Sequence, residues 1–287
     1  MNKLTDAKRA AIVKALVEGN SIRATCRLTG AAKATVLKLL VEVGEFCDGY
    51  QNFRLRQLSA VRVEADEIWA FVGAKQQRAV RAGDGDIWTF TAIDADSKLM
   101  ISWLVGARTV ENASAFMQDL RSRMTRKIQL TTDGHSMYET AVRSAFNWDE
   151  VDRAMLVKEY GQTEGVDGSR RYSPAVCTGA TKVRKIGRPD VDLVSTSYIE
   201  RSNLTLRMQQ RRFTRLTNAF SKKAENHARA VSLYFMYYNF CRAHQTLTKA
   251  NGGVHTSPVM AAGLTTHIWK IEEILALMDP AKVVTSN

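Results

Sequence analysis

Residues 61–73 read VRVEADEIWAFVG, a stretch dominated by β-branched and aromatic side chains. This composition predicts a β-strand, because such side chains pack well on a pleated surface. Asp66 stands in the middle of the stretch, surrounded by Val61, Val63, Ile68 and Trp69. A carboxylate inside a strand costs free energy unless it is paired, hydrogen-bonded or bound to a metal ion. The sequence therefore predicts a strand in which Asp66 needs a specific partner.

The residues that follow predict the rest of a sheet. Residues 85–106, GDIWTFTAIDADSKLMISWLVG, predict two further strands joined across the turn-forming residues 94–97. Next come an amphipathic helix at 109–124 and a short buried strand, KIQLTTDG, that ends at Asp133. A helix at 136–146 and a strand at 154–160 complete the pattern. Three antiparallel strands followed by alternating helices and strands predict an α/β protein with a mixed sheet and flanking helices.

Residues 1–48 predict a small all-α helix-turn-helix domain. A helix with an apolar stripe is expected from Asp6 to Glu18, a short one from Ser21 to Leu28, and a third after the turn at Gly30. The outward face of the third helix would present Lys33, Thr35 and Lys38 to the major groove of DNA. The alternative is a plain three-helix bundle with a solvated lysine face.

The remaining boundaries follow from composition. We expect a linker at 49–61, a domain that contains the predicted sheet at 62–247 and a helical tail at 248–287, with a loop over 161–189 that is rich in Gly, Arg, Ser and Pro. Long helices are predicted at 197–218 and 221–242, and their aromatic run LYFMYYNF, residues 233–240, is typical of a packing surface.

Charge favours a polyanionic partner. The chain has 287 residues, a formal net charge of +12 and a pI near 9.7. Between Thr181 and Lys223 eleven Lys and Arg residues stand against three acids, so most of the excess surrounds Glu200. The basic residues here that we expect to contact DNA are Lys182, Arg184, Lys185, Arg188, Arg201, Arg207, Arg211, Arg212 and Arg215.

Two other classes of protein are not favoured. The four cysteines lie far apart without a Cys-x-x-Cys pair, and the pair Cys241 and His244 has no second ligand pair, so no zinc site is predicted. No stretch approaches the roughly 18 apolar residues of a membrane span. We therefore expect a cytoplasmic protein without a membrane partner.

Three carboxylates form a candidate metal site. Asp66 and Asp133 belong to strands expected to be neighbours, and Glu200 begins a later helix. Convergent carboxylates bind a pair of Mg²⁺ or Mn²⁺ ions about 4 Å apart, which can act on a phosphodiester. Alternatives are that Asp133 caps the helix near Ser136, that Asp66 faces solvent, and that the adjacent Glu67 replaces Asp66.

The order of these acids resembles the RNase-H-like core of DDE transposases and retroviral integrases. More specifically, DEIWAFVGAK (66–75), YIERSNLTLR (198–207) and FSK (220–222) resemble transposases of the bacterial insertion-sequence-one family. The resemblance covers about residues 61–242. In that family Arg207, two turns after Glu200, corresponds to a basic residue held against the transposon end.

The resemblance implies a DNA transposase that nicks 3′ ends and transfers them into target DNA. Asp66, Asp133 and Glu200 would bind two Mg²⁺ ions, Arg207, Arg211, Arg212 and Arg215 would hold the phosphate backbone, and the first domain would find the terminal inverted repeats. A homodimer or larger assembly on double-stranded DNA, associated with the bacterial nucleoid, is expected. The alternatives are a domesticated, non-catalytic DNA-binding protein and a nuclease without joining activity.

Overall fold

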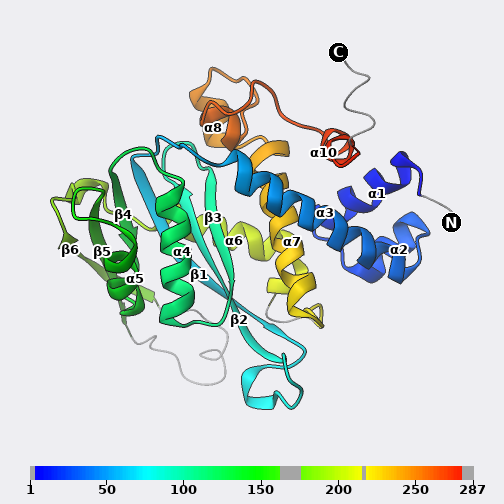
Figure 1. Cartoon of the computed structure of the whole chain (residues 1–287), viewed down its shortest axis with the longest axis horizontal. Coiled ribbons are helices and arrows are strands. Elements are labelled where there is room, and N and C mark those ends of the chain that lie inside the picture. The colour runs from blue at the N-terminus through cyan, green and yellow to red at the C-terminus, as the bar shows by residue number, and fades with distance from the viewer. Residues whose placement is uncertain (1–3, 162–175, 215–217, 280–287) are drawn as a thin grey trace.

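Strand β1, Arg62–Val72, forms where the sequence predicts it and lies in the interior of a mixed sheet (Figure 1). The computed structural model describes residues 4–161, 176–214 and 218–279. Within them the sheet has six strands in the order β3-β2-β1-β4-β5-β6. The other strands are β2 Gly85–Asp94, β3 Met100–Gly106, β4 Ile128–Thr132, β5 Val151–Gly161 and β6 Val176–Ile186. β1 pairs with β4 and β4 with β5 in parallel, and the other pairs are antiparallel.

The two faces of the sheet are covered by different helices. Helices α4, Val110–Ser122, and α5, Met137–Ala145, cover one face, where Val63 and Ala65 of β1 join a buried cluster with Phe116 and Tyr138. Helices α6, Ser197–Gln209, and α7, Ala224–Met236, cover the other face, where Ile68 and Ala70 are buried with Ile199 and Tyr234. Because side chains alternate along a strand, β1 contributes to both cores. This confirms the predicted α/β class with flanking helices.

The N-terminal helices pack against the same body. They are α1, Asp6–Val17; α2, Ile22–Thr29; and α3, Lys33–Arg54. Gly30 provides the turn between α2 and α3 with a φ of 64°, a conformation that favours glycine. α3 continues across residue 48 and runs along α7 (Figure 1). Gly44 permits this approach, since a Cβ there would lie 2.4 Å from the carbonyl oxygen of Arg229. The domain boundaries and the DNA-binding role of these helices stay predictions.

The C-terminal segments continue α7 and return to α1. They comprise the π-helical η5 Tyr237–Cys241, α8 Gln245–Ala250, α9 Pro258–Ala261 and α10 Ile271–Leu277. Seven side chains of the run 233–240 are buried, which confirms it as a packing surface, and Tyr237 is half-buried. Asn239 is one of them, and its side-chain amide makes two 3.0 Å hydrogen bonds with the backbone N–H and C=O of Met100 in β3. The segment after α7 is therefore hydrogen-bonded to the edge strand β3.

Three predicted elements are wrong in extent. The predicted loop at 161–189 contains β6, which pairs with β5 and exposes most of its polar side chains, so it lacks the apolar alternation that marks a strand. The helix predicted to end at 218 stops at Gln209, because Gln210 is extended, and a 3₁₀ turn, η4 Arg211–Phe213, follows. The helix predicted at 221–242 is divided between α7 and η5. Residues 162–175 lie outside the described part.

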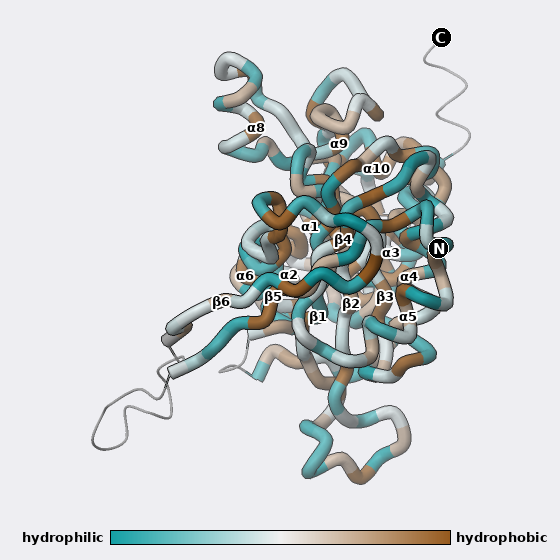
Figure 2. The backbone as a smooth tube through the Cα atoms, turned by 90° about the vertical axis from the view of Figure 1, so that its left-hand side faces the viewer, coloured by the Kyte–Doolittle hydropathy of each residue, from teal (hydrophilic) through white to brown (hydrophobic). Residues whose placement is uncertain are grey.

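Two short 3₁₀ turns, η1 Gln76–Arg78 and η3 Val191–Leu193, complete the elements. Figure 2 shows β5 and β6 extending beyond the rest of the sheet, as does the connection between β1 and β2. That connection carries Lys75, Arg78 and Arg81. In the described part of the chain, each helix is too short or too polar to cross a lipid bilayer.

Candidate functional site

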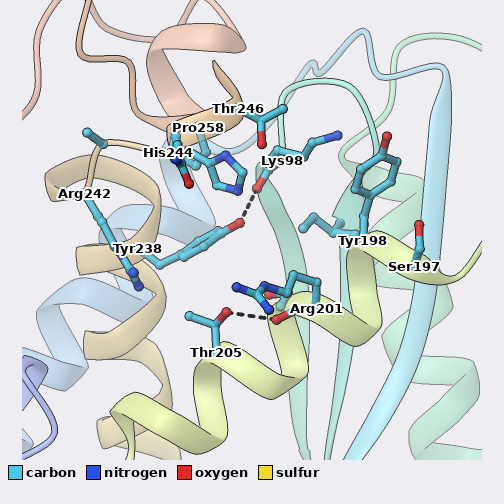
Figure 3. A pocket seen from close by; sticks show the side chains of 14 residues that line it. Lys98, Ser197, Tyr198, Arg201, Thr205, Tyr238, Arg242, His244, Thr246 and Pro258 are labelled. Carbon is cyan, nitrogen blue, oxygen red and sulfur yellow. Dashed lines mark hydrogen bonds between the residues drawn. The ribbon is translucent and has the colours of Figure 1, made fainter. Parts of the chain in front are cut away.

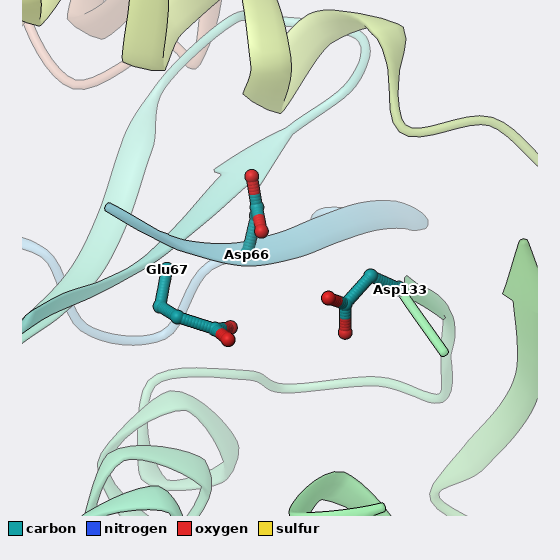
Figure 4. Close-up of side chains that lie close together, drawn as sticks. All are labelled: Asp66, Glu67 and Asp133. Atoms are coloured by element: carbon teal, nitrogen blue, oxygen red, sulfur yellow. The ribbon is translucent and has the colours of Figure 1, made fainter. Parts of the chain in front are cut away.

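The parallel pairing of β1 and β4 brings Asp66 and Asp133 together. In this register Ala65 is the partner of Thr132, so each acid is the next residue along its strand direction. One carboxylate oxygen from each of Asp66, Glu67 and Asp133 lies within 4.8 Å of the other two (Figure 4). Asp133 follows the last residue of β4, at a carboxyl edge of parallel strands, where ligands commonly bind in α/β sheets. The sequence prediction that these two aspartates converge is therefore consistent with the geometry.

Asp66 and Glu67 leave β1 on opposite sides, as Figure 4 shows. Asp66 faces α6, where the side-chain amide of Asn203 donates a 2.9 Å hydrogen bond to its carboxylate. Glu67 faces α5 and accepts a 2.8 Å hydrogen bond from the Tyr138 hydroxyl. The guanidinium of Arg108 also pairs with Glu67, whose side chain is 1% exposed. Glu67 is thus neutralised within the protein, and Asp66 is the acid turned toward the helix that carries Glu200.

The electrostatics of Asp66 are unfavourable for an ionised carboxylate. Burial raises the pKa of Asp66 to about 7, and the negative charges of Glu67 and Asp133 act in the same direction. Hydrogen bonds from the Glu67 backbone and from Asn203 oppose the shift without cancelling it. No ion pair of Asp66 with a basic side chain occurs among the described residues. A buried acid of this kind gains stability from a cation placed beside it.

Helix α6 presents three polar residues on one face. Glu200, Asn203 and Arg207 are separated by three and four positions, which places them one above the other along the helix. Asn203 reaches Asp66, but Glu200 is not part of the compact acidic group. Its carboxylate accepts hydrogen bonds from the ammonium of Lys158 on β5 and, at 2.5 Å, from the Thr196 hydroxyl. The structure therefore brings two of the three predicted ligands together and leaves Glu200 outside that group, paired with Lys158.

The Lys158–Glu200 pair shifts the pKa of the lysine. Partial burial works to lower the pKa of the Lys158 ammonium, but the hydrogen bond and the charge of Glu200 outweigh it, and the pKa is raised. The ion pair thus places a cation on Glu200, in the role that a metal ion would have in the predicted site. A divalent ion would have to displace this ammonium before Glu200 could join Asp66 and Asp133.

The donor set fits a hard divalent cation. The three grouped side chains are all carboxylates. Carboxylate oxygens are the ligands that Mg²⁺ and Mn²⁺ prefer, whereas sulfur and imidazole ligands would favour softer metals. Asp66 accepts a hydrogen bond from the Asn203 amide, and Asp133 accepts one of 3.1 Å from the His135 backbone N–H. Within the described part of the chain neither carboxylate has an ion pair like that of Glu67 with Arg108. Asp66 and Asp133 would hold the ion, and Glu200 would complete the site after leaving Lys158.

Glu64 fixes the position of α6 over β1. Its side chain, on the same face of β1 as Asp66, accepts hydrogen bonds of 2.8 and 2.9 Å from the backbone N–H groups of Tyr198 and Ile199. These are free amides of the first helical turn, where a carboxylate is also favoured by the helix dipole. Burial raises the pKa of Glu64, and the two amide hydrogen bonds counteract part of the shift. The helix that carries Glu200 is therefore capped by the strand that carries Asp66.

The predicted DNA-binding residues occupy three regions. Lys33 and Lys38 are exposed on α3, Thr35 is half-buried, and Lys38 lies 3.7 Å from Glu42. The second region is β6 and the turn after it, with Lys182, Arg184, Lys185 and Arg188 all exposed. The third comprises Arg201 and Arg207 on α6 with Arg211 and Arg212 on η4. Arg215 lies outside the described residues.

Two of these regions meet at a cleft between the N-terminal helices and η4. A cavity of about 650 Å³ separates α2 and α3 from η4 and α7. Its basic residues are Arg23, Lys33, Arg211, Arg212, Lys222 and Lys223, and the described residues that line it include no carboxylate. Arg212 is largely buried there, which lowers its pKa to about 10, and its guanidinium bonds the Ser221 hydroxyl at 2.9 Å. A buried cation with no acid beside it favours an anionic ligand.

Sequence reasoning did not identify Glu64, Asn203, Tyr138, Arg108 or Lys158. Two of them carried a usable signal: Glu64 is two residues before Asp66 and shares its strand face, and Asn203 is three residues after Glu200 and shares its helix face. The other three depend on tertiary contacts. The sequence left open that Asp66 faces solvent, or that Glu67 rather than Asp66 is the metal ligand. The structure favours neither alternative, because Asp66 contacts α6 and Glu67 is paired with Arg108.

Comparison of the chain with protein-family models and with curated proteins found no match. The candidate site therefore depends on the geometry of Asp66, Asp133 and α6.

Replacing Glu64 tests the docking of α6. Glu64→Ala removes the acceptor of two helix N–H groups, and we expect it to lower the free energy of unfolding by about 1–2 kcal/mol, the usual cost of a lost cap. Glu64→Gln keeps an acceptor oxygen and should lose less. Urea denaturation of both variants measures this. Equal stability of Glu64→Ala and the unmodified protein would contradict the docking role.

Replacing Asp66 tests the acidic cluster without any assay of activity. Because folding raises the pKa of Asp66, the associated stability is present below its ordinary pKa of about 4 and is lost as the pH rises through about 7. At pH 8 in EDTA, Asp66→Asn should therefore stabilise the protein by about 1–2 kcal/mol. Mg²⁺ should raise the Tm of the unmodified protein and leave that of the variant unchanged.

The neighbouring acid supplies the matched control. Glu67→Gln breaks a buried ion pair with Arg108, so we expect a loss of about 3 kcal/mol whether or not Mg²⁺ is present. Differential scanning fluorimetry of the three proteins separates the two effects. A destabilised Asp66→Asn with an unaltered response to Mg²⁺ would exclude the metal assignment.

Proposed function

We propose that the chain is a DDE-type DNA transposase of the insertion-sequence-one kind, with an RNase-H-like catalytic sheet and a helix-turn-helix unit formed by α1, α2 and α3. The observation that carries the proposal is the meeting of Asp66, within β1, and Asp133, at the end of the neighbouring strand β4, beneath a helix that bears Glu200. The strand order and the mixed sheet are compatible with an RNase-H-like fold. The peptides around Asp66 and Glu200 resemble that family of transposases.

The reaction would be hydrolysis of a phosphodiester followed by strand transfer. Divalent ions at the acidic cluster would activate water or a 3′-hydroxyl and neutralise charge on the scissile phosphate. Asp66 and Asp133 would supply oxygen ligands, and Asn203 would hold the Asp66 carboxylate in position through its 2.9 Å hydrogen bond. Hydrolysis would break the bond between phosphorus and the 3′-oxygen at the element's end, leaving a 3′-hydroxyl on the element and a 5′-phosphate on the flanking DNA. Attack of that 3′-hydroxyl on a target phosphodiester would form the new phosphodiester while the target's own 3′-oxygen leaves as a hydroxyl.

Basic residues on two sides of α6 would hold the DNA. Arg207 lies two turns after Glu200 on the same helix face. The cleft lined by Lys33, Arg211 and Arg212 lies between the proposed helix-turn-helix and the sheet domain, so a duplex bound by α3 would pass beside it. Terminal inverted repeats, target DNA and a second copy of the chain are the proposed partners, and the nucleoid is the proposed location.

One observation favours the non-catalytic alternative. Glu200 is paired with Lys158 and stands apart from the acidic cluster, an arrangement that a DNA-binding protein without catalysis could keep permanently. In the transposase, binding of metal and DNA phosphate would compete with Lys158 for Glu200.

Acid variants test catalysis. Asp66→Asn and Glu200→Gln should each abolish Mg²⁺-dependent nicking of DNA that carries the element's ends, because each removes a metal ligand, while the Kd for DNA stays unchanged. Asp149→Asn, at an exposed turn before β5, is the control and should retain nicking. Gel assays of cleavage and joining also separate a transposase from a nuclease. Cleavage by Glu200→Gln at the original rate would remove Glu200 from the site.

Lys158 offers an independent test of the same site. Lys158→Gln frees the Glu200 carboxylate, so we expect half-maximal nicking at a lower Mg²⁺ concentration than in the unmodified protein. Lys127→Gln is the matched control, since the Lys127 ammonium pairs with the Asp152 carboxylate at 2.9 Å and Lys127 is not among the expected DNA contacts. A Mg²⁺ requirement that is identical in Lys158→Gln and the unmodified protein would show that the ion pair does not compete with metal.

A further inference from the structure

A second basic cavity lies beside the first turns of α6, distinct from the acidic cluster (Figure 3). Its volume is about 450 Å³, within the range of small-ligand sites. Residues from three parts of the chain line it: the end of β2 with its turn, α6, and the segment from η5 to α9. The basic members are Lys98, Arg201, Arg242 and His244.

Helix α6 separates this cavity from the acidic cluster. Ser197, Arg201 and Thr205, spaced by four residues, line the cavity. Glu200 and Asn203 lie on the adjacent side of the helix, toward Lys158 and Asp66. Because an α-helix is only about 10 Å across, a polymer that passes over its first turn can contact both sides. The cavity is therefore placed to act on the same ligand as the acidic cluster.

The positive charges of the cavity are not neutralised by ion pairs. None of Lys98, Arg201 and Arg242 lies within ion-pair distance of a carboxylate of the described residues, and no acid of that part of the chain lines the cavity. The charges of Asp94, Asp96 and Glu64 act on Lys98 from farther away. Arg242 donates a 2.6 Å hydrogen bond to the neutral side chain of Gln209, and Arg201 is exposed. The guanidinium groups of Arg201 and Arg242 line the cavity, and the Lys98 ammonium, which donates a hydrogen bond to the Ala95 carbonyl, adds positive charge at its wall, so an anion within the cavity is favoured.

Lys98 is held rigidly at the wall. It is 6% exposed, has a φ of 60°, and its ammonium lies 3.2 Å from the centroid of the Tyr198 ring. The backbone carbonyl of Lys98 accepts a 3.0 Å hydrogen bond from the Tyr238 hydroxyl, drawn in Figure 3. A positive φ in a lysine is strained, so this backbone is kept by its surroundings.

His244 supplies an unused polar atom. Its Nδ1 is buried and has no hydrogen-bond partner among the described residues. Burial lowers the pKa of His244, and the positive charges of Lys98 and Arg242 lower it further, so the ring is neutral near pH 7. A neutral imidazole can donate one hydrogen bond from a ring nitrogen to an anionic oxygen.

We propose that this cavity binds a backbone phosphate of a DNA strand that crosses the first turn of α6. The planar guanidinium groups of Arg201 and Arg242 suit phosphate oxygens, and the exposed position of Arg201 leaves the cavity accessible to a strand bound outside the protein. The proposal rests on the proposed function for the identity of the polymer. It adds Lys98, Arg242 and His244, which the resemblance does not assign, to the DNA-contacting surface.

The test measures DNA binding in EDTA, so it does not depend on cleavage. Fluorescence anisotropy of labelled duplex DNA with the full chain, over a series of salt concentrations, gives the slope of log K against log salt. The slope is negative, and each lost phosphate contact reduces its magnitude by about 0.9. Arg201→Gln and Arg242→Gln should each lower it by that amount, which is about a threefold smaller loss of affinity between 50 and 200 mM salt. Arg201 is exposed, so its variant should fold normally.

Lys249→Gln, on exposed α8 outside the cavity, is the control and should keep the original slope. Original slopes in both arginine variants, or an equal reduction in the control, would overturn the proposal. A second arm titrates inorganic phosphate by calorimetry: binding that Arg242→Gln abolishes, combined with unchanged DNA slopes, would assign the cavity to a free phosphate compound and overturn the DNA assignment. If only the cavity proposal is wrong, the unmodified protein still binds and nicks DNA. If the proposed function is wrong, the unmodified protein does not nick DNA.

Discussion

Two carboxylates on one face of β1 hold helix α6 against the sheet, and the arrangement of the candidate functional residues on α6 depends on this contact. Glu64 accepts hydrogen bonds from the first-turn amides at Tyr198 and Ile199, and Asp66 accepts one from Asn203. The two contacts fix both the start of the helix and its rotation about its own axis. Glu200 is consequently directed toward β5 and Arg201 toward the basic cavity.

The same strand shows how neighbouring acids are used differently. Glu67 is buried with Arg108 and Tyr138, so its charge is compensated and it contributes to packing between the sheet and α5. Asp66 is half-buried beside Asp133 without such compensation, and its pKa is raised to about 7. An ionised carboxylate without a charged partner lowers the stability of the fold more than a neutral side chain at the same position would. Stability alone therefore does not explain an acid at position 66. This contrast within one dipeptide is the physical argument for a cation at Asp66.

Much of this organisation follows from local sequence signals. The strand at 61–73, its two antiparallel neighbours and the end of β4 at Asp133 were predictable from side-chain composition and turn residues, because these elements are apolar and continuous. Strand β6 was not predictable, since it is a mostly polar edge strand and its extended conformation is stabilised by pairing with β5. The pairing of Glu200 with Lys158 was equally hidden: the residues are 42 positions apart, and only the tertiary fold brings them together.

The central claim is that Asp66, rather than Glu67, forms a divalent-cation site with Asp133. Anomalous scattering from crystals of the protein grown with Mn²⁺ and short duplex DNA tests it most directly. The account predicts anomalous density bounded by the Asp66 and Asp133 carboxylates, with Glu200 released from Lys158 and turned toward the ion. Density that contacts neither aspartate, or unchanged carboxylates with no bound Mn²⁺ at saturating concentration, would contradict it.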